Sequence, residues 1–121
     1  MLCVKMFFGR YEMKKGISFY FGYEIETNKR AKLIKDSGLD CVMTCVDTRF
    51  KRENGTLKNQ INAFKQQGLE ITSLHMQYKS SDLPHFWKKD YKGYKLYKTL
   101  IKDIKIANKY GFICVVVHLK G

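Results

Sequence analysis

Hydrophobic and polar positions alternate along this chain with two periods, one typical of helices and the other of strands. Helical spacing is clearest at Leu57, Ile61 and Phe64, which stand at positions i, i+4 and i+7. The same pattern predicts three helices, at residues 27–37, 56–67 and 91–110. Short runs that are dense in apolar residues predict four strands, at residues 17–21, 41–46, 71–74 and 113–117.

A glycine precedes each predicted strand. Gly38, Gly68 and Gly111 each follow a predicted helix, whereas Gly16 does not. Helices commonly end with a residue at positive φ, a conformation that glycine adopts without steric cost. These three glycines are therefore expected to end the helices, and Thr56 or Asn54 is expected to cap the start of the second one.

The order of the elements is strand, helix, strand, helix, strand, helix, strand. Strands that are apolar on both faces are typical of a parallel sheet covered by helices. The fold class is therefore expected to be α/β, with about four parallel strands and three intervening helices in one domain at residues 14–121. Residues 1–13 are expected to form a leader or an extra strand, because Lys5 interrupts a short apolar run that is unlike a signal peptide.

Lysine dominates the charge, with 23 Lys and Arg against 11 Asp and Glu and a net charge of +12. Such an excess is typical of proteins that bind polyanions. Here the lysines are spread along the predicted helices without an interleaved aromatic pattern, so solvated helix faces are favoured over a nucleic-acid surface. Cys41, Cys45 and Cys114 lie in apolar runs, where free cysteine behaves as a small hydrophobe. This indicates a reducing, cytoplasmic setting, and no segment is long enough to predict membrane insertion.

Titratable and aromatic residues follow all four predicted strands. In α/β folds the carboxyl ends of the strands form the ligand-binding face. The candidate substrate-binding residues there are Tyr23, Glu24, Asp47, His75, Tyr78 and His118. Glu24 and Asp47 have an alternative role as helix caps, and a single histidine is often structural. His75 and His118 follow neighbouring strands, so they could share a metal ion or flank a sugar.

Three segments resemble the xylose isomerase-like TIM barrel superfamily of sugar phosphate isomerases and epimerases. They are GISFYFGYE, SLHMQY and the closing VVVH, and the resemblance covers residues 14–121. It implies a (β/α)8 barrel, a sugar or sugar phosphate as substrate and a divalent metal such as Zn, Mn or Mg. In the apurinic-site endonuclease branch of this superfamily, the residues that match His75 and His118 bind zinc.

A complete barrel of this kind has eight strand–helix units and about 250 residues. This chain supplies four strands, and the family's later metal ligands and acid/base carboxylates have no counterpart in it. The chain is therefore expected to be the N-terminal half of a barrel, truncated after the fourth strand and inactive alone. It is expected to pair as a homodimer or with a missing C-terminal half, because strands one and four would leave open edges.

Two other functions remain open from the sequence. One is a nucleic-acid-binding or apurinic-site endonuclease-like half-barrel, which the charge favours. The other is a non-catalytic module that associates with itself or a partner, which would need neither a metal nor a catalytic residue.

Overall fold

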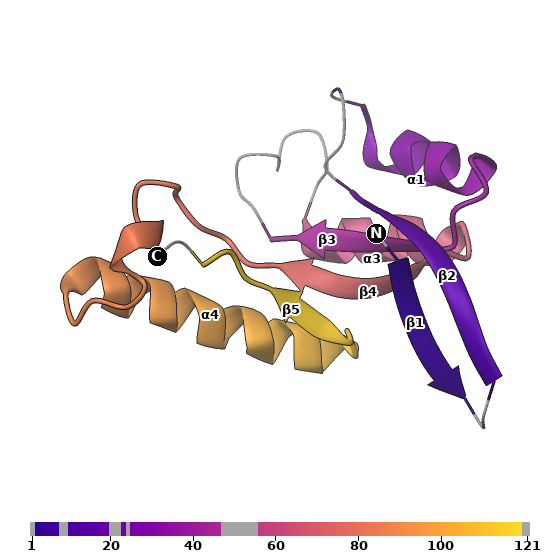
Figure 1. Cartoon of the computed structure of the whole chain (residues 1–121). Coiled ribbons are helices and arrows are strands. Elements are labelled where there is room, and N and C mark those ends of the chain that lie inside the picture. The colour runs from indigo at the N-terminus through magenta and orange to yellow at the C-terminus, as the bar shows by residue number, and fades with distance from the viewer. Residues whose placement is uncertain (1, 8–9, 20–22, 24, 47–55, 120–121) are drawn as a thin grey trace. The chain divides into compact units, whose positions relative to one another are not determined.

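The computed structural model describes residues 2–7, 10–19, 23, 25–46 and 56–119 (Figure 1). It divides the chain into two compact units, Met1–Thr72 and Ser73–Gly121. The boundary falls inside β4 (Glu70–His75), so this strand contributes to both units.

The first unit has an α/β arrangement, as the sequence predicts. Its elements are β1 (Leu2–Phe7), β2 (Arg10–Ser18), α1 (Thr27–Asp36), β3 (Cys41–Cys45), α3 (Leu57–Gln66) and the first half of β4. β2 and β3 pair in parallel, with Ile17 opposite Val42. The amide of Glu70 donates to the carbonyl of Asp40 and places β4 beside β3.

An N-terminal hairpin precedes the parallel strands. β1 pairs with β2 in antiparallel fashion from Leu2 opposite Lys15 to Phe7 opposite Arg10. The first predicted strand, at residues 17–21, starts too late, because pairing with β1 begins the strand at Arg10. Ile17 and Ser18 lie in β2 as predicted, and residues 20–21 lie outside the described residues. The expected boundary between residues 13 and 14 falls inside β2. The first predicted strand was expected to have an open edge, but this edge pairs with β1.

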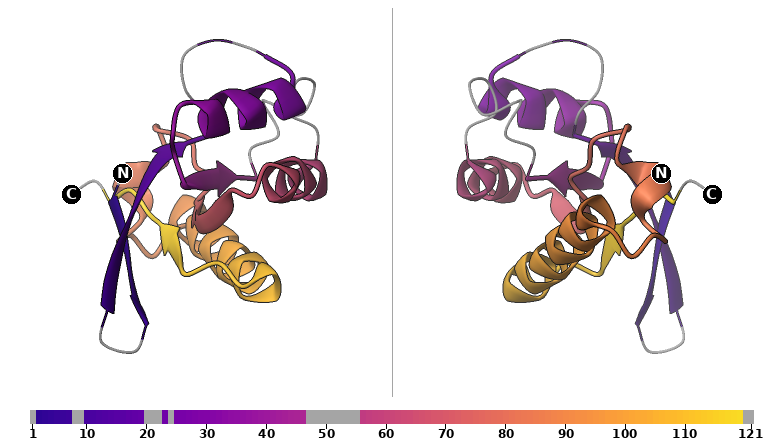
Figure 2. Two further views of the ribbon diagram at one scale, coloured as in Figure 1. Left: turned by 90° about the vertical axis from the view of Figure 1, so that its right-hand side faces the viewer. Right: turned by 90° about the vertical axis from the view of Figure 1, so that its left-hand side faces the viewer.

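The core of this unit lies between its helices and strands. The helices α1 and α3 pack against each other (Figure 2). The rings of Phe19 and Phe64, both fully buried, meet edge to face with centroids 4.9 Å apart. The other members of this buried cluster are Ala31, Ile34, Val42, Ala63 and Leu69. The amphipathic stripes that predict the helices are therefore the faces that form this core.

The second unit contains the rest of β4, the short 3₁₀ helix η2 (Leu83–His85), α4 (Tyr91–Tyr110) and β5 (Cys114–Val116). β4 and β5 pair in parallel, with His75 opposite Val116. α4 contacts β5 and η2, and its buried residues include Leu96 and Ala107.

The predicted ends of the helices are confirmed. Gly38, Gly68 and Gly111 follow the three helices with φ of 76°, 67° and 72°, in the left-handed region that favours glycine. The side chain of Thr56, one of the two predicted caps, accepts the amide hydrogen of Asn59 at the start of α3. Gly16 instead lies within β2, opposite Cys41.

Of the three cysteines that lie in apolar runs of the sequence, two are buried in the structure. None of the three forms a disulfide among the described residues; Cys41 and Cys45 are buried, whereas Cys114 is exposed. Cys114 begins β5, whose only neighbour among the described strands is β4, so part of this strand faces solvent. None of the helices in the described ranges is long and apolar enough to cross a membrane.

Candidate functional site

Two histidines meet at the carboxyl ends of the parallel strands in the second unit. His75 is the last residue of β4 and lies opposite Val116, the last residue of β5. His118 follows two residues later, so the alternation of an extended chain keeps it on the same side as Val116. The two Nε2 atoms are 2.8 Å apart, a normal hydrogen-bond distance. The prediction that these strand ends bring His75 and His118 together is therefore confirmed.

The hydrogen-bond partners of His75 determine which nitrogen carries the proton. Its Nδ1 lies 2.9 Å from the carbonyl oxygen of Met76, which can only accept, so Nδ1 donates. In neutral His75 the Nε2 atom is then an acceptor, and His118 must donate through its own Nε2. If His118 instead carried its proton on Nδ1, two Nε2 lone pairs would be directed at one point.

Tyr78 forms the third side of this group. Its ring centroid is 5.7 Å from that of His75 and 5.2 Å from that of His118. His118 is exposed, whereas His75 and Tyr78 are half-buried, so the three rings are open to solvent on one side. We call His75, Tyr78 and His118 the two-histidine site.

A buried carboxylate fixes the segment between His75 and Tyr78. Asp103 of α4 is 1% exposed, and its Oδ2 accepts the backbone amide hydrogen of Gln77 at 3.2 Å. Burial raises the pKa of Asp103, and the hydrogen bond from Gln77 offsets part of this effect. Asp103 was not among the predicted site residues, although its spacing from Leu96 and Ala107, at i+7 and i−4, indicates the buried face of α4.

Replacing Asp103 with asparagine is expected to stabilise the chain at neutral pH. The raised pKa means that the folded state takes up a proton at a higher pH than the unfolded chain does, so the ionised carboxylate reduces stability above that pKa. Asparagine removes the charge and still offers an acceptor to Gln77. Thermal melts at several pH values should give a higher melting temperature for the variant than for the natural chain. This difference should shrink as the pH falls through the raised pKa of Asp103.

The control for this prediction is Asp103→Ala, which also removes the acceptor. The lost hydrogen bond to the Gln77 amide and the cavity left by a buried side chain should make this variant less stable than the natural chain. A lower melting temperature for Asp103→Asn at neutral pH would contradict the prediction.

Of the other predicted site residues, Tyr23 is the one that the structure describes. Tyr23 belongs to the first unit, where its side chain is exposed and its carbonyl accepts a hydrogen bond from buried Arg30. Glu24 and Asp47 lie outside the described residues. The N-cap of α1 is Glu26, whose carboxylate accepts the amide hydrogens of Asn28 and Lys29. The hydrogen bond from Asn28 is the main cause of the lowered pKa of Glu26.

The two histidines are suited to supply two ligands to one metal ion. A metal-binding histidine usually donates its second ring nitrogen to a carbonyl or carboxylate, as His75 does to Met76. Tetrahedral zinc with bonds of about 2.0–2.1 Å would hold two nitrogens about 3.3 Å apart, so the pair would open by about 0.5 Å. Within the described part of the chain, no group of three or more His, Cys, Asp or Glu residues could hold a metal. Further ligands would have to come from water or from groups outside this part.

Comparison with known proteins does not assign the chain to a family. No protein-family model matches it, and no curated protein matches its sequence significantly.

Proposed function

We propose that this chain forms half of a sugar phosphate isomerase- or epimerase-like barrel and binds a divalent metal at the two-histidine site. The observation that carries this proposal is the 2.8 Å separation of the Nε2 atoms of His75 and His118 at the ends of paired parallel strands. The carbonyl of Met76 orients His75 with its Nε2 lone pair toward the site.

The rings around the site suit a carbohydrate ligand. Tyr78 presents an aromatic ring beside both histidines, and such a ring can pack against the apolar C–H groups of a sugar. Its hydroxyl and the imidazole nitrogens provide donors and acceptors for sugar hydroxyls. The solvent-exposed side of His118 leaves a path for a small polar ligand to enter.

A divalent metal at this site would polarise a substrate carbonyl or hydroxyl, the chemistry that sugar isomerisation and epimerisation need. Proton transfer would require a carboxylate or another base as well. Glu24 and Asp47 remain the candidates of this chain for that role. The proposal further includes a second half-barrel, supplied by another copy or another segment, that completes the ligand set.

Metal-dependent binding of a sugar phosphate tests this function. With zinc present, glucose 6-phosphate and ribulose 5-phosphate should shift the NMR signals of His75, Tyr78 and His118, and removal of zinc with a chelator should abolish the shifts. The His118→Ala variant should lose the response. His85→Gln, a substitution that keeps a donor for Asp90, should retain it.

Shifts that persist in His118→Ala, or that are the same with and without metal, would contradict the proposal. Zinc binding at the two histidines without any response to either sugar phosphate would remove the sugar function and leave a metal site alone.

A further inference from the structure

A stripe of lysines and tyrosines covers the outer face of α4. Residues three and four apart lie on the same face of a helix, and seven residues follow this spacing along the whole of α4. They are Tyr91, Tyr94, Lys95, Lys98, Lys102, Lys105 and Lys109, and we call them the α4 stripe. The buried residues Leu96, Asp103 and Ala107 lie on the opposite face.

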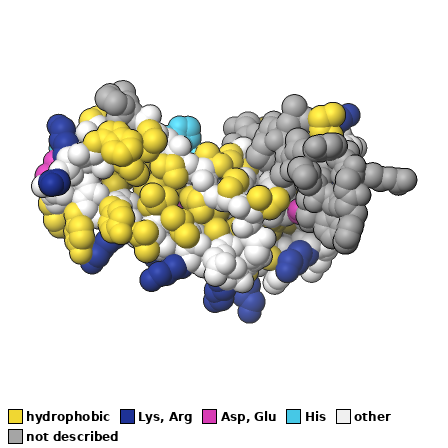
Figure 3. Space-filling view, turned by 60° about the horizontal axis from the view of Figure 1, so that its bottom comes forward, with side chains coloured by type: hydrophobic (Ala, Val, Ile, Leu, Met, Phe, Trp, Pro, Cys, Tyr) yellow, Lys and Arg dark blue, Asp and Glu magenta, His cyan; other side chains and the backbone are white. Residues whose placement is uncertain are grey.

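No acidic residue of α4 belongs to the stripe. The only acidic residue of α4 is Asp103, which is buried on the other face. By contrast, Lys32 of α1 pairs with Asp36 four residues later, at 2.6 Å. Like charges three and four residues apart destabilise a helix, so the five lysines of the stripe do not serve the stability of α4. On the face shown in Figure 3, Lys and Arg side chains lie around a broad area of hydrophobic side chains, a class that includes tyrosine in this view, and acidic side chains occupy little of the surface.

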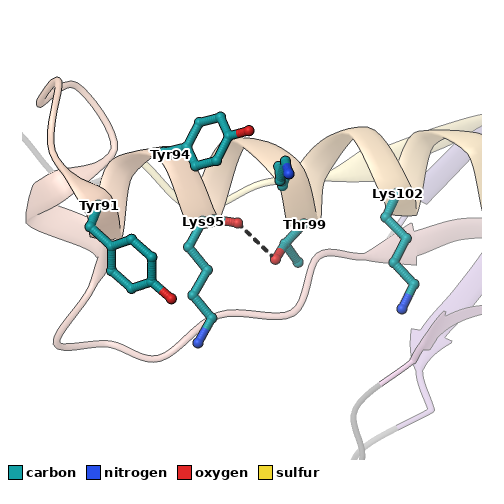
Figure 4. Close-up of a pocket in the computed structure, with 6 residues that line it drawn as sticks. Tyr91, Tyr94, Lys95, Thr99 and Lys102 are labelled. Carbon is teal, nitrogen blue, oxygen red and sulfur yellow. Dashed lines mark hydrogen bonds between the residues drawn. The ribbon is translucent and has the colours of Figure 1, made fainter.

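Tyrosine rings lie directly among these lysines. Tyr91 and Tyr94 are 78% and 55% exposed, which is far more than a ring that contributes to a core. The ammonium group of Lys98 lies 4.8 Å from the centroid of the Tyr94 ring. Together with Lys95, Thr99 and Lys102, these residues line a shallow hollow of about 320 Å³ (Figure 4). The expectation that the lysines lack interleaved aromatic residues is therefore wrong for α4, where tyrosines and lysines alternate along residues 91–98.

We propose that the α4 stripe binds single-stranded nucleic acid, with lysines on the phosphates and the two tyrosines against bases. Proteins that bind single strands combine a positive track with exposed aromatic rings on which bases stack. The five lysines span about 21 Å at the 1.5 Å rise of a helix, with successive side chains about 5–6 Å apart. This gives a row of charges long enough to follow several nucleotides.

A membrane surface fits the same stripe less well. A helix that lies in a bilayer interface inserts an apolar face, and the apolar face of α4, with Leu96 and Ala107, is buried within the protein. The α4 stripe holds only tyrosines among its lysines, and the exposed Ile104 is not part of it. The observations therefore favour a polyanion that offers aromatic faces as well as phosphates.

Fluorescence anisotropy with a labelled twelve-residue oligothymidine tests the proposal. The triple variant Lys95→Ala, Lys98→Ala, Lys102→Ala should lower affinity at least tenfold at about 100 mM salt, and it should reduce the salt slope by about 2, because each phosphate contact on a single strand contributes about 0.7. Tyr94→Ala should weaken binding about tenfold, and Tyr94→Phe should bind as the natural chain does.

The matched control is Lys29→Ala, Lys32→Ala, Lys35→Ala on α1, which removes the same charge from exposed positions of the first unit. Equal losses in the two triple variants would show that net charge alone drives binding, and this would overturn the proposal. Absence of binding to the oligonucleotide, or binding only to vesicles that contain phosphatidylserine, would overturn it as well. The test uses no metal and no sugar, so its outcome is independent of the two-histidine site.

Discussion

Replacement of Gly93 with alanine is expected to destabilise the second unit by about 3 kcal/mol, the upper part of the usual range for an overpacked site. A Cβ at this position would lie 2.2 Å from the carbonyl oxygen of Lys88 and 2.4 Å from that of His85. Both atoms belong to the backbone, so neither can rotate away. Asp90 adds to the constraint, because its Oδ1 accepts the Gly93 amide hydrogen at 2.9 Å and caps α4.

Urea denaturation followed by circular dichroism would measure this loss. Domains of this size are stable by about 5–15 kcal/mol, so a change of about 3 kcal/mol moves the midpoint clearly. The control is Asn108→Ala, an exposed substitution on the same helix that should change stability by no more than about 0.5 kcal/mol. If Gly93→Ala and Asn108→Ala unfold at the same urea concentration, the close approach of the loop to α4 is not present in solution.

The second large effect concerns metal affinity. If His75 and His118 are the two metal ligands that the protein supplies, replacement of either one with alanine removes one of these two ligands. Zinc affinity should then fall at least tenfold, or about 1.4 kcal/mol. Binding by the natural chain should also weaken as the pH falls, because protons compete with the metal for the imidazole nitrogens.

Isothermal titration with zinc would give these affinities. His85→Gln is the control, because His85 contacts Asp90 at the start of α4 and has no contact with the two-histidine site among those described. If the His75→Ala and His118→Ala variants bind zinc as tightly as the His85→Gln variant does, the metal binds elsewhere.

The helices could be predicted closely because each one combines a clear apolar stripe with defined ends. α4 occupies the predicted range, residues 91–110, and Gly111 ends it at positive φ. The first strand could not be placed, because its start depends on pairing with β1, a contact that the apolar pattern of residues 17–21 does not contain. The division of the chain into two units also depends on packing between elements and has no marker in the sequence.

The two-histidine site was predictable for a simple reason. Parallel strands end at the same edge of a sheet, so residues that follow two neighbouring strands meet. Asp103 and the α4 stripe were missed because they depend on which side of a helix faces the protein. In the sequence, a single acidic residue among lysines is typical of an exposed helix face. The helix shows that Asp103 lies with Leu96 and Ala107 on the buried face.

The most direct test of the account is nitrogen NMR of the histidine rings in the metal-free chain, followed by addition of zinc. The hydrogen bonds predict that neutral His75 is protonated at Nδ1 and neutral His118 at Nε2, and that zinc shifts both Nε2 signals together. Mixed tautomers on both rings, and Nε2 signals that zinc leaves unchanged, would show that the two histidines form no common site.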